Sequence, residues 1–252
     1  LTRNKQLAES IHRAFNYLKE NAIFTFGSKN EHPYAYVVDE MNDREIKLGA
    51  NAAAILAFTK YTKVFKDEQY LKLAQALAYG IERMQKVETG EFIHILNYPD
   101  LTVKEAFRII YYDGEAAFSL MRLYEIDGND RWLKVVENAF RNFIKQDYWK
   151  KHDHWLSYCT NELTRYKPED RYFEFGLKNV FYRLDFILKR TTTYPTFLEL
   201  TTAAYKMIER IKMLNKQHLL EPFNESKLEK TIHHRAHYQL NGYFFPEVAM
   251  YF

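Results

Sequence analysis

Two aromatic and two acidic side chains open one of the predicted helices, in the stretch YYDGE at Tyr111–Glu115. General acid–base or nucleophilic catalysis uses one carboxyl group as the acid and a second as the base or nucleophile, and Asp113 is the first candidate for this chemistry. The alternative is structural, with Asp113 as the helix cap and Glu115 as a first-turn acid. Because a cap does not require Tyr111 and Tyr112, we expect both rings to bind substrate beside Asp113.

A second carboxylate for this chemistry is expected from another part of the chain. Asp39, with its neighbour Glu40, and Glu91 lie in segments that interrupt the helical pattern. These segments are expected to be loops next to the helix starts. Asp39 and Glu91 are therefore the candidate catalytic partners of Asp113.

Histidine and tyrosine side chains before two further helices offer a different chemistry. The stretch KHDHW ends on His154 and Trp155, and His154 is a candidate general base or ligand-orienting donor. Asp153 either fixes the tautomer of a neighbouring histidine or caps the helix, and Trp155 is expected to contact substrate. Tyr194, before Pro195, is either a catalytic tyrosine or a rim-packing residue.

The C-terminal helix pattern is rich in histidine. His233 and His237 are four residues apart and share one helix face, but this spacing alone, without a third ligand, does not predict a metal. His237 is a candidate catalytic histidine, and His234 and Asn241 are candidate substrate ligands. Arg235 is a candidate for bidentate binding of a carboxylate or phosphate.

Helical periodicity dominates the chain, which has only 8 Gly and 6 Pro among its 252 residues. Alternation of apolar residues near 24–43 predicts a small β-hairpin. Val87–Arg108 reads as an insertion between two helical hairpins. Beyond a first amphipathic segment near 7–18, helices are expected at about 47–64, 68–86, 113–126, 129–146, 154–165, 169–190, 195–215 and 225–240.

A helical hairpin is repeated along the chain. Segments 52–81 and 115–144 both contain a helix rich in small residues, a tyrosine, a charged turn, and then Tyr70 or Trp132 at the start of a second helix; a weaker copy spans 157–187. Repeated hairpins bury their faces by stacking, as an open solenoid or a closed ring. The irregular spacing of the copies favours the ring, where insertions gather at one end.

The segment GEAAFSLMRLYEIDGNDRWLKVVENAF, residues 114–140, resembles the repeat unit of the six-hairpin glycosidase superfamily, and the resemblance extends over about 46–190. It implies an all-α (α/α) toroid, here a single domain over 1–252, and a glycan substrate. About nine predicted helices, against twelve in six hairpins, imply an incomplete or open ring. In such a ring the inner helices start at one mouth, where their dipoles favour anionic or hydroxyl-rich ligands.

Composition excludes several other classes. Lys and Arg exceed Asp and Glu by 36 − 33 = +3 without a block of like charge, which does not indicate a nucleic-acid partner. One cysteine, Cys159, excludes an internal disulfide. No membrane span, signal peptide or nucleotide-binding motif is recognisable, so we expect no cofactor and a cytoplasmic location. The chain starts at Leu1 rather than Met, so we expect a piece of a longer protein with other domains.

Three functional hypotheses follow. The first is glycoside hydrolysis by Asp113 with a second carboxylate. The second is sugar epimerisation or polysaccharide β-elimination, in which His154 works with His237 or His234, and Tyr194 or Arg235 stabilises the developing charge. The third is a non-catalytic glycan-binding or accessory domain of a polysaccharide-assembly protein.

Overall fold

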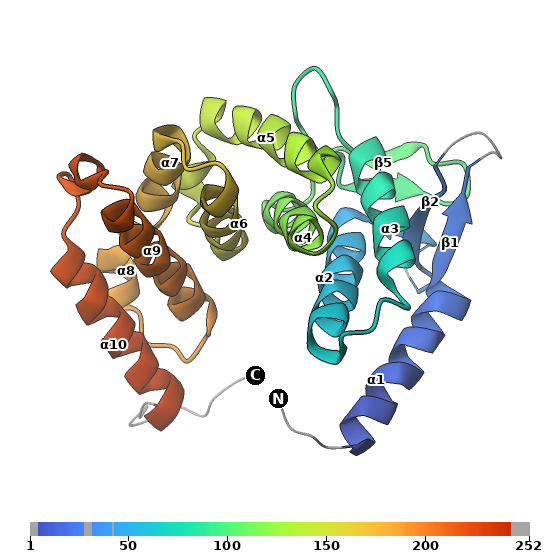
Figure 1. Ribbon diagram of the computed structural model, residues 1–252, viewed down its shortest axis with the longest axis horizontal. Helices are drawn as coiled ribbons and strands as arrows, with labels where there is room; N and C mark the ends of the chain where they lie inside the picture. The colour runs from blue at the N-terminus through green and yellow to red at the C-terminus, as the bar shows by residue number, and fades with distance from the viewer. Residues whose placement is uncertain (1–4, 28–31, 42, 243–252) are drawn as a thin grey trace. The chain divides into compact units, whose positions relative to one another are not determined.

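The computed structural model describes residues 5–27, 32–41 and 43–242. The chain is mostly helical, with one small antiparallel sheet, and it divides into two compact units, residues 1–142 and 143–252 (Figure 1).

The first unit combines two helical hairpins with the sheet. Helices α2 and α4 pack closely against each other, and α3 packs against both α2 and strand β2 (Figure 1). Its elements are α1 (Lys5–Tyr17), the π-helical turn η1 (Leu18–Ala22), β1 (Ile23–Phe26), β2 (Tyr34–Asp39), β3 (Glu45–Lys47), α2 (Leu48–Phe65), α3 (Leu71–Arg83), β4 (Ile95–Asn97), β5 (Val103–Glu105), α4 (Tyr111–Asp127) and α5 (Asp130–Lys145), whose last turn belongs to the second unit.

The aromatic residue that follows each charged turn is buried. Tyr70 stacks on Phe58 of the preceding helix at a centroid distance of 5.3 Å. The indole nitrogen of Trp132, which is fully buried, donates to Asp127 at 3.0 Å. Each ring thus joins the second helix of its hairpin to the end of the first.

The predicted hairpin is part of a five-stranded antiparallel sheet in the order β1-β2-β3-β4-β5. Val38 pairs with Ile46, and Ile46 pairs with Leu96, so the centre of the sheet lies between β2 and β4. The insertion Val87–Arg108 supplies β4 and β5, two strands that the sequence pattern did not predict. Its short apolar run Ile95–Leu96 is too brief for periodicity to separate strand from loop.

The second unit is helical in the residues described. The single helix expected over 169–190 is two helices, and nothing in the intervening Phe181–Leu184 has the low helix propensity that would mark a break in the sequence. Its elements are η2 (Tyr148–Lys151), α6 (His154–Tyr166), α7 (Asp170–Phe181), α8 (Leu184–Lys189), α9 (Thr196–Met213), η3 (Gln217–Leu220) and α10 (Glu225–Asn241).

Helix α9 runs through the core of this unit. Leu200, Ala204, Met207 and Ile211 recur at helical spacing and are buried against α7, α8 and α10. Ser157 of α6 donates to the carbonyl of Leu200 at 3.0 Å and joins the starts of α6 and α9. The first turns of these two helices are therefore neighbours.

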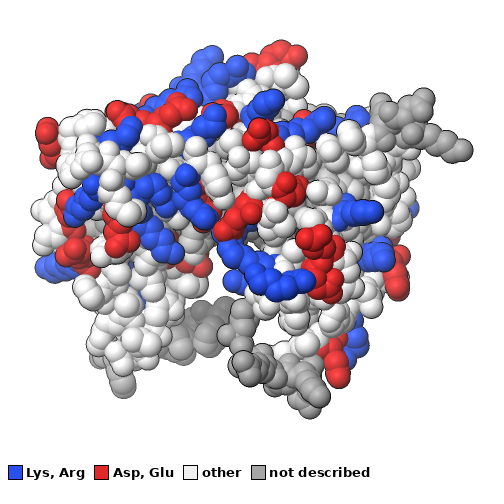
Figure 2. Space-filling model, in the orientation of Figure 1, with Lys and Arg blue, Asp and Glu red and all other residues white. Residues whose placement is uncertain are grey.

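On the face drawn in Figure 2, basic and acidic side chains are interspersed. Within the described part of the chain, no helix has the length and apolarity needed to cross a membrane.

Replacing Gly80 with alanine is expected to destabilise the protein. A Cβ at Gly80 would lie 2.3 Å from the carbonyl oxygen of Ala35 in β2, so backbone must move, which costs roughly 1–3 kcal/mol in the free energy of unfolding. Gly176→Ala is the matched control, because its Cβ meets mainly the flexible end of Met207, at 2.7 Å. Urea unfolding measures both variants, and an equal or larger loss for Gly176→Ala would contradict this packing.

Candidate functional site

The first turns of α2 and α4 touch at Gly49. A Cβ at this position would lie 2.5 Å from the Glu115 carboxylate and 2.5 Å from the ring of Tyr112. Only the absence of a side chain at Gly49 allows the two helix starts to approach so closely. The residues YYDGE therefore lie at the junction of two helix N-termini, where the backbone dipoles favour negative charge.

The structural alternative expected Asp113 to cap its helix, but Asp113 does not occupy the cap position. Helix α4 starts at Tyr111, two residues earlier than predicted, which puts Asp113 inside the first turn. Its carboxylate lies 3.1 Å from Nε2 of His94, and the two side chains are 2% and 0% exposed. Burial raises the pKa of Asp113, while the hydrogen bond from His94 works in the opposite direction.

Backbone contacts fix the position of His94. Its carbonyl accepts a hydrogen bond from the N–H of Leu48 at the start of α2, at 2.9 Å. Its own N–H donates to the carbonyl of Ala106 at 3.2 Å. Nδ1 accepts from the amide of Arg108 at 2.9 Å and from that of Ile109 at 3.3 Å. Since both amides are donors, Nδ1 carries no proton, and the ring proton sits on Nε2, facing Asp113.

Glu115 of α4 is a half-buried carboxyl group. It forms no hydrogen bond or ion pair with another residue that the structure describes, and burial alone raises its pKa to about 7. A carboxyl group with this pKa is partly protonated at neutral pH and is able to serve as a general acid. The structural alternative expected Glu115 to be a first-turn acid, but α4 begins at Tyr111, so Asp113 is the acid of the first turn and Glu115 lies just beyond it.

The other acidic candidates of this unit are engaged in ion pairs. Asp39, at the end of β2, is bonded to Lys47 at 2.6 Å. This hydrogen bond is the largest cause of a raised Lys47 pKa, to which the hydroxyl of Tyr112 makes a smaller contribution. Glu91 is paired with Lys86 at 2.9 Å on the surface, and its charge contributes to the raised pKa of Asp113.

Tyr111, which was predicted to bind substrate, is exposed.

The start of α6 holds a second group of polar side chains, in the other unit. Asp153 caps the helix by accepting from the amide of Leu156 at 2.9 Å, so its cap interpretation is confirmed. His154 lies 3.8 Å from Glu199 of α9, and burial lowers its pKa to about 4, which keeps the ring neutral at physiological pH. Tyr158 is hydrogen-bonded to Glu199, and burial is the main cause of its raised pKa.

Other predicted ligands lie around α10 and α6. The ring of Trp155 is 5.1 Å from that of His154. His237 is exposed and bonded to Asn241 at 3.0 Å, and His234 packs edge-on against Tyr238 at 4.7 Å. Tyr194 is 68% exposed. The structure thus pairs His237 with Asn241 and His154 with Trp155.

Arg235 is buried without an acidic partner in the described chain. Its guanidinium lies over the ring of Tyr238 at 4.6 Å, and Nη1 reaches the carbonyl of Thr192 at 3.4 Å. Nε and Nη2 are buried and form no hydrogen bond with a described residue. Burial lowers the pKa of Arg235.

His233 lines a surface hollow of about 420 Å³ between α9 and α10, together with Glu229, Tyr205, Thr202 and Ile232. In the described ranges, no group of three histidine, cysteine, aspartate or glutamate side chains is arranged to hold a metal ion.

Several residues of these sites escaped sequence reasoning. His94 lies in the insertion Val87–Arg108 and was not among the predicted site residues, but it is buried and bonded to Asp113. Pro195 marked the start of a helix in the sequence. Nothing in the sequence indicated that the carboxylate of Glu199, four residues later, faces another helix. Only long-range packing brings either residue to its partner, and no local pattern encodes that.

Comparison with known proteins shows the fold. A family 76 glycoside hydrolase from a bovine Bacteroides thetaiotaomicron strain superposes with a TM-score of 0.54 at 14% identity, over 84% of this chain and 52% of that one. A family 76 glycoside hydrolase (mannosidase) from Bacteroides thetaiotaomicron VPI-5482 gives a TM-score of 0.57 at 12% identity, over 84% and 67%. A sugar epimerase from a ruminal bacterium gives 0.50 at 13%, over 83% and 70%.

The fold is that of an α/α toroid. The resemblance stated from residues 114–140 is confirmed at the level of fold, and these structural neighbours are carbohydrate-active enzymes. The chain spans about half the length of the first of them. Neither a protein-family model nor the sequence of a curated protein matches the chain.

Glu115 is expected to make the stability of the protein depend on pH. Its folded-state pKa of about 7 exceeds the ordinary value of 4.5, so the folded protein binds this proton more tightly than the unfolded chain does. The stabilisation is therefore complete below pH 4.5 and is lost as the pH rises through about 7.

Urea unfolding of wild type and Glu115→Gln between pH 4 and 8 measures this effect. The variant should gain stability relative to wild type as the pH rises through this range, because glutamine does not ionise. Glu88→Gln, at an exposed carboxylate of the same unit, is the control. A difference between Glu115→Gln and wild type that is independent of pH would show that Glu115 titrates normally.

Proposed function

We propose that the protein is a carbohydrate-active enzyme that hydrolyses a glycosidic bond, with Glu115 as the general acid and Asp113 as the second carboxylate. The observation that carries this proposal is the raised pKa of Glu115, about 7, in a carboxyl group without a described hydrogen-bonding partner at the junction of two helix N-termini. An acid that protonates the leaving oxygen must hold its proton near neutral pH, and burial gives Glu115 this property.

The environment of Asp113 suits the complementary role. A base or nucleophile must be ionised. Burial raises the pKa of Asp113, and the hydrogen bond that Nε2 of His94 donates at 3.1 Å opposes this rise by favouring the charged carboxylate. Asp113 is only 2% exposed, whereas Glu115 is half-buried, so Glu115 is the group with more access to a leaving oxygen. Asp39 and Glu91 are less suitable as partners, because each is held by a lysine.

The substrate that we propose is a glycan, and mannose-containing oligosaccharides are the first to test, because one structural neighbour is described as a mannosidase. Tyr111 and Tyr112 flank the two carboxyl groups in sequence, and flat amphipathic rings suit the apolar faces of sugars. Tyr111 is exposed and available for such contact.

Loss of either carboxyl should abolish hydrolysis while the fold persists. Removal of a general acid typically lowers the rate by roughly 10²–10⁴-fold, so Glu115→Gln and Asp113→Asn should both lose at least about 100-fold in kcat/KM. Reducing-sugar release from mannosides, neutral oligosaccharides and uronate-containing oligosaccharides measures this, with Glu88→Gln as the control. Full activity of Glu115→Gln would contradict the assignment, and binding without turnover by wild type would favour the accessory-domain hypothesis.

A second candidate function, sugar epimerisation or β-elimination, is supported by the group at the start of α6. Proton abstraction beside a carbonyl needs a neutral base, and His154, with its pKa lowered to about 4, is neutral at pH 7. The hydroxyl of Tyr158 lies in the same group and donates to Glu199, so it would stabilise a developing negative charge by exchanging this hydrogen bond for one to the substrate. The structural likeness to a sugar epimerase motivates the test.

If this second function operates, sugars incubated with wild type in heavy water should incorporate deuterium, or an unsaturated product absorbing in the near ultraviolet should appear. His154→Asn should abolish either signal, since it removes the base. His218→Gln, at an exposed histidine of the same unit, is the matched control. Deuterium incorporation that survives His154→Asn would exclude His154 as the base.

A further inference from the structure

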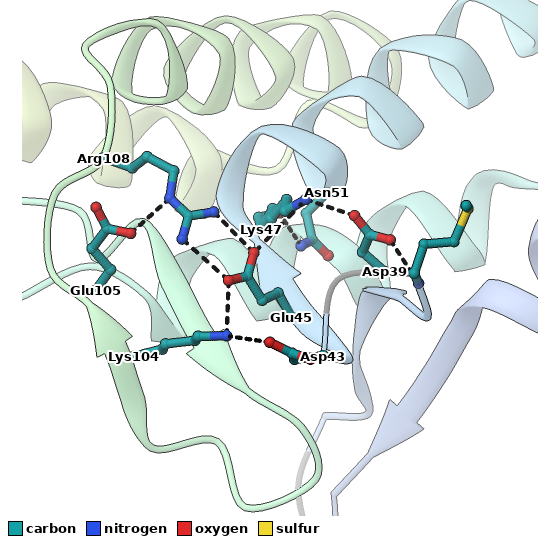
Figure 3. Close-up of polar contacts among 9 residues, drawn as sticks. Asp39, Asp43, Glu45, Lys47, Asn51, Lys104, Glu105 and Arg108 are labelled. Atoms are coloured by element: carbon teal, nitrogen blue, oxygen red, sulfur yellow. Dashed lines mark hydrogen bonds and ion pairs between the residues drawn. The ribbon is translucent and has the colours of Figure 1, made fainter.

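Glu45 is the centre of an ion-pair network on the sheet of the first unit (Figure 3). It is 6% exposed and receives a bidentate pair from Arg108, with Nη1–Oε2 at 2.9 Å and Nη2–Oε1 at 3.1 Å. Lys104 lies 3.0 Å from the same carboxylate, and Glu105 accepts from Nε of Arg108 at 2.6 Å. The hydrogen bond from Arg108 is the main reason that the pKa of Glu45 falls to about 2.

This network holds one particular piece of backbone. Arg108 lies in the segment between β5 and α4, and its side chain is held by Glu45 of β3 and by Glu105 of β5. Planar bidentate pairing restrains a guanidinium in direction as well as in distance. The backbone of residue 108 is thereby tied to the sheet immediately before α4 begins.

The same backbone contacts His94. The amides of Arg108 and Ile109 both point at Nδ1, at 2.9 and 3.3 Å, and they select the tautomer with its proton on Nε2. That proton faces Asp113 at 3.1 Å. If the segment moved, Nδ1 would be free to take the proton, and Nε2 would then lose the hydrogen that it donates to Asp113.

We propose that the Glu45–Arg108 ion pair is a positioning device, which fixes the tautomer of His94 and thereby the hydrogen bond that His94 donates to Asp113. Glu45 and Arg108 are positioning residues rather than catalytic ones. Among the described residues, neither side chain forms a hydrogen bond or ion pair with Asp113 or Glu115. The relevance to catalysis rests on the proposed function, whereas the effect on His94 does not.

Other groups near this chain of contacts leave the role of Arg108 intact. Lys47 is 3.7 Å from Glu45 but has its shorter contact with Asp39, at 2.6 Å. The rings of Phe107 and Tyr112 pack against His94 at 4.7 and 5.5 Å and carry no charge that would select a tautomer. Glu91 is the other charge acting on Asp113, and it raises the pKa of that residue.

Glu45→Gln is the decisive variant, because loss of the Glu45 charge and loss of the His94 hydrogen bond change the pKa of Asp113 in opposite directions. Removing a negative charge lowers the pKa of a nearby carboxyl by Coulomb interaction alone, since repulsion is relieved. Loss of the hydrogen bond from His94 raises the pKa of Asp113 instead. Carboxyl ¹³C titration of aspartate-labelled protein, with Asp113→Asn for assignment, measures which occurs, and the proposal predicts a rise.

Imidazole ¹⁵N spectra of the same proteins give a readout that needs no substrate. Wild type should display a single Nε2–H tautomer for His94, and Glu45→Gln should display a mixture with the Nδ1–H form. Arg108→Lys retains the charge but loses the planar fork, so it should produce the same change to a smaller degree. Glu82→Gln, which breaks a comparable carboxylate–guanidinium pair with Arg131 at 2.8 Å, is the matched control and should leave His94 unchanged.

The proposal is overturned if His94 keeps a single Nε2–H tautomer in folded Glu45→Gln and Arg108→Lys, or if the pKa of Asp113 falls or stays constant. If hydrolysis is also measured, Glu45→Gln should lower kcat with little change in KM and move the acidic limb of the pH profile upward. Absence of hydrolysis in wild type would refute the proposed function but would leave the ¹⁵N and ¹³C outcomes to decide the role of the ion pair.

Discussion

The buried hydrogen bond between His94 and Asp113 determines how the first unit is built around its candidate site. A carboxylate that is 2% exposed is stable as an ion only if donors compensate for the lost water, and Nε2–H of His94 is such a donor. The bond joins the sheet to the first turn of α4. Because His94 also accepts the amide of Leu48, it fixes the start of α2 relative to the same turn.

Close approach of helix starts is the second constraint. Gly49 lets α2 meet Tyr112 and Glu115, and in the other unit Ser157 of α6 bonds to the backbone of α9. In each unit, two helices begin next to each other, and a titratable side chain near these starts has a shifted pKa, Glu115 in one unit and His154 in the other. Helix N-termini favour negatively charged or hydrogen-bond-accepting ligands, because their dipoles and unpaired amides point there.

The parts of the fold that depend on local pattern were predictable. Helical periodicity located α2, α4 and α10 to within two residues at each end, and the repeat correctly placed Tyr70 and Trp132 at the start of a second helix. Local pattern failed where no local signal exists. The break between α7 and α8 lacks glycine and proline, and β4 contains only Ile95–Asn97, too short to show a period.

The candidate site was predictable only in part, for a related reason. Asp113, Tyr111 and Tyr112 could be recognised as candidate site residues from the sequence, because a helix cap does not require two tyrosines beside the acid. The partner of Asp113, His94, directly precedes β4, and the residues around His94 include Glu45 of β3 and Arg108 of the segment before α4. Their relation is set by strand register, with Glu45 opposite Asn97, and register follows from the whole sheet rather than from any one segment.

A crystal structure of the protein with a bound, slowly hydrolysed oligosaccharide tests the central claim most directly. Our account predicts a glycosidic oxygen within hydrogen-bonding distance of Glu115, with the Asp113 carboxylate still bonded to Nε2 of His94. A sugar bound in the crystal without any contact to the first turn of α4 would contradict it.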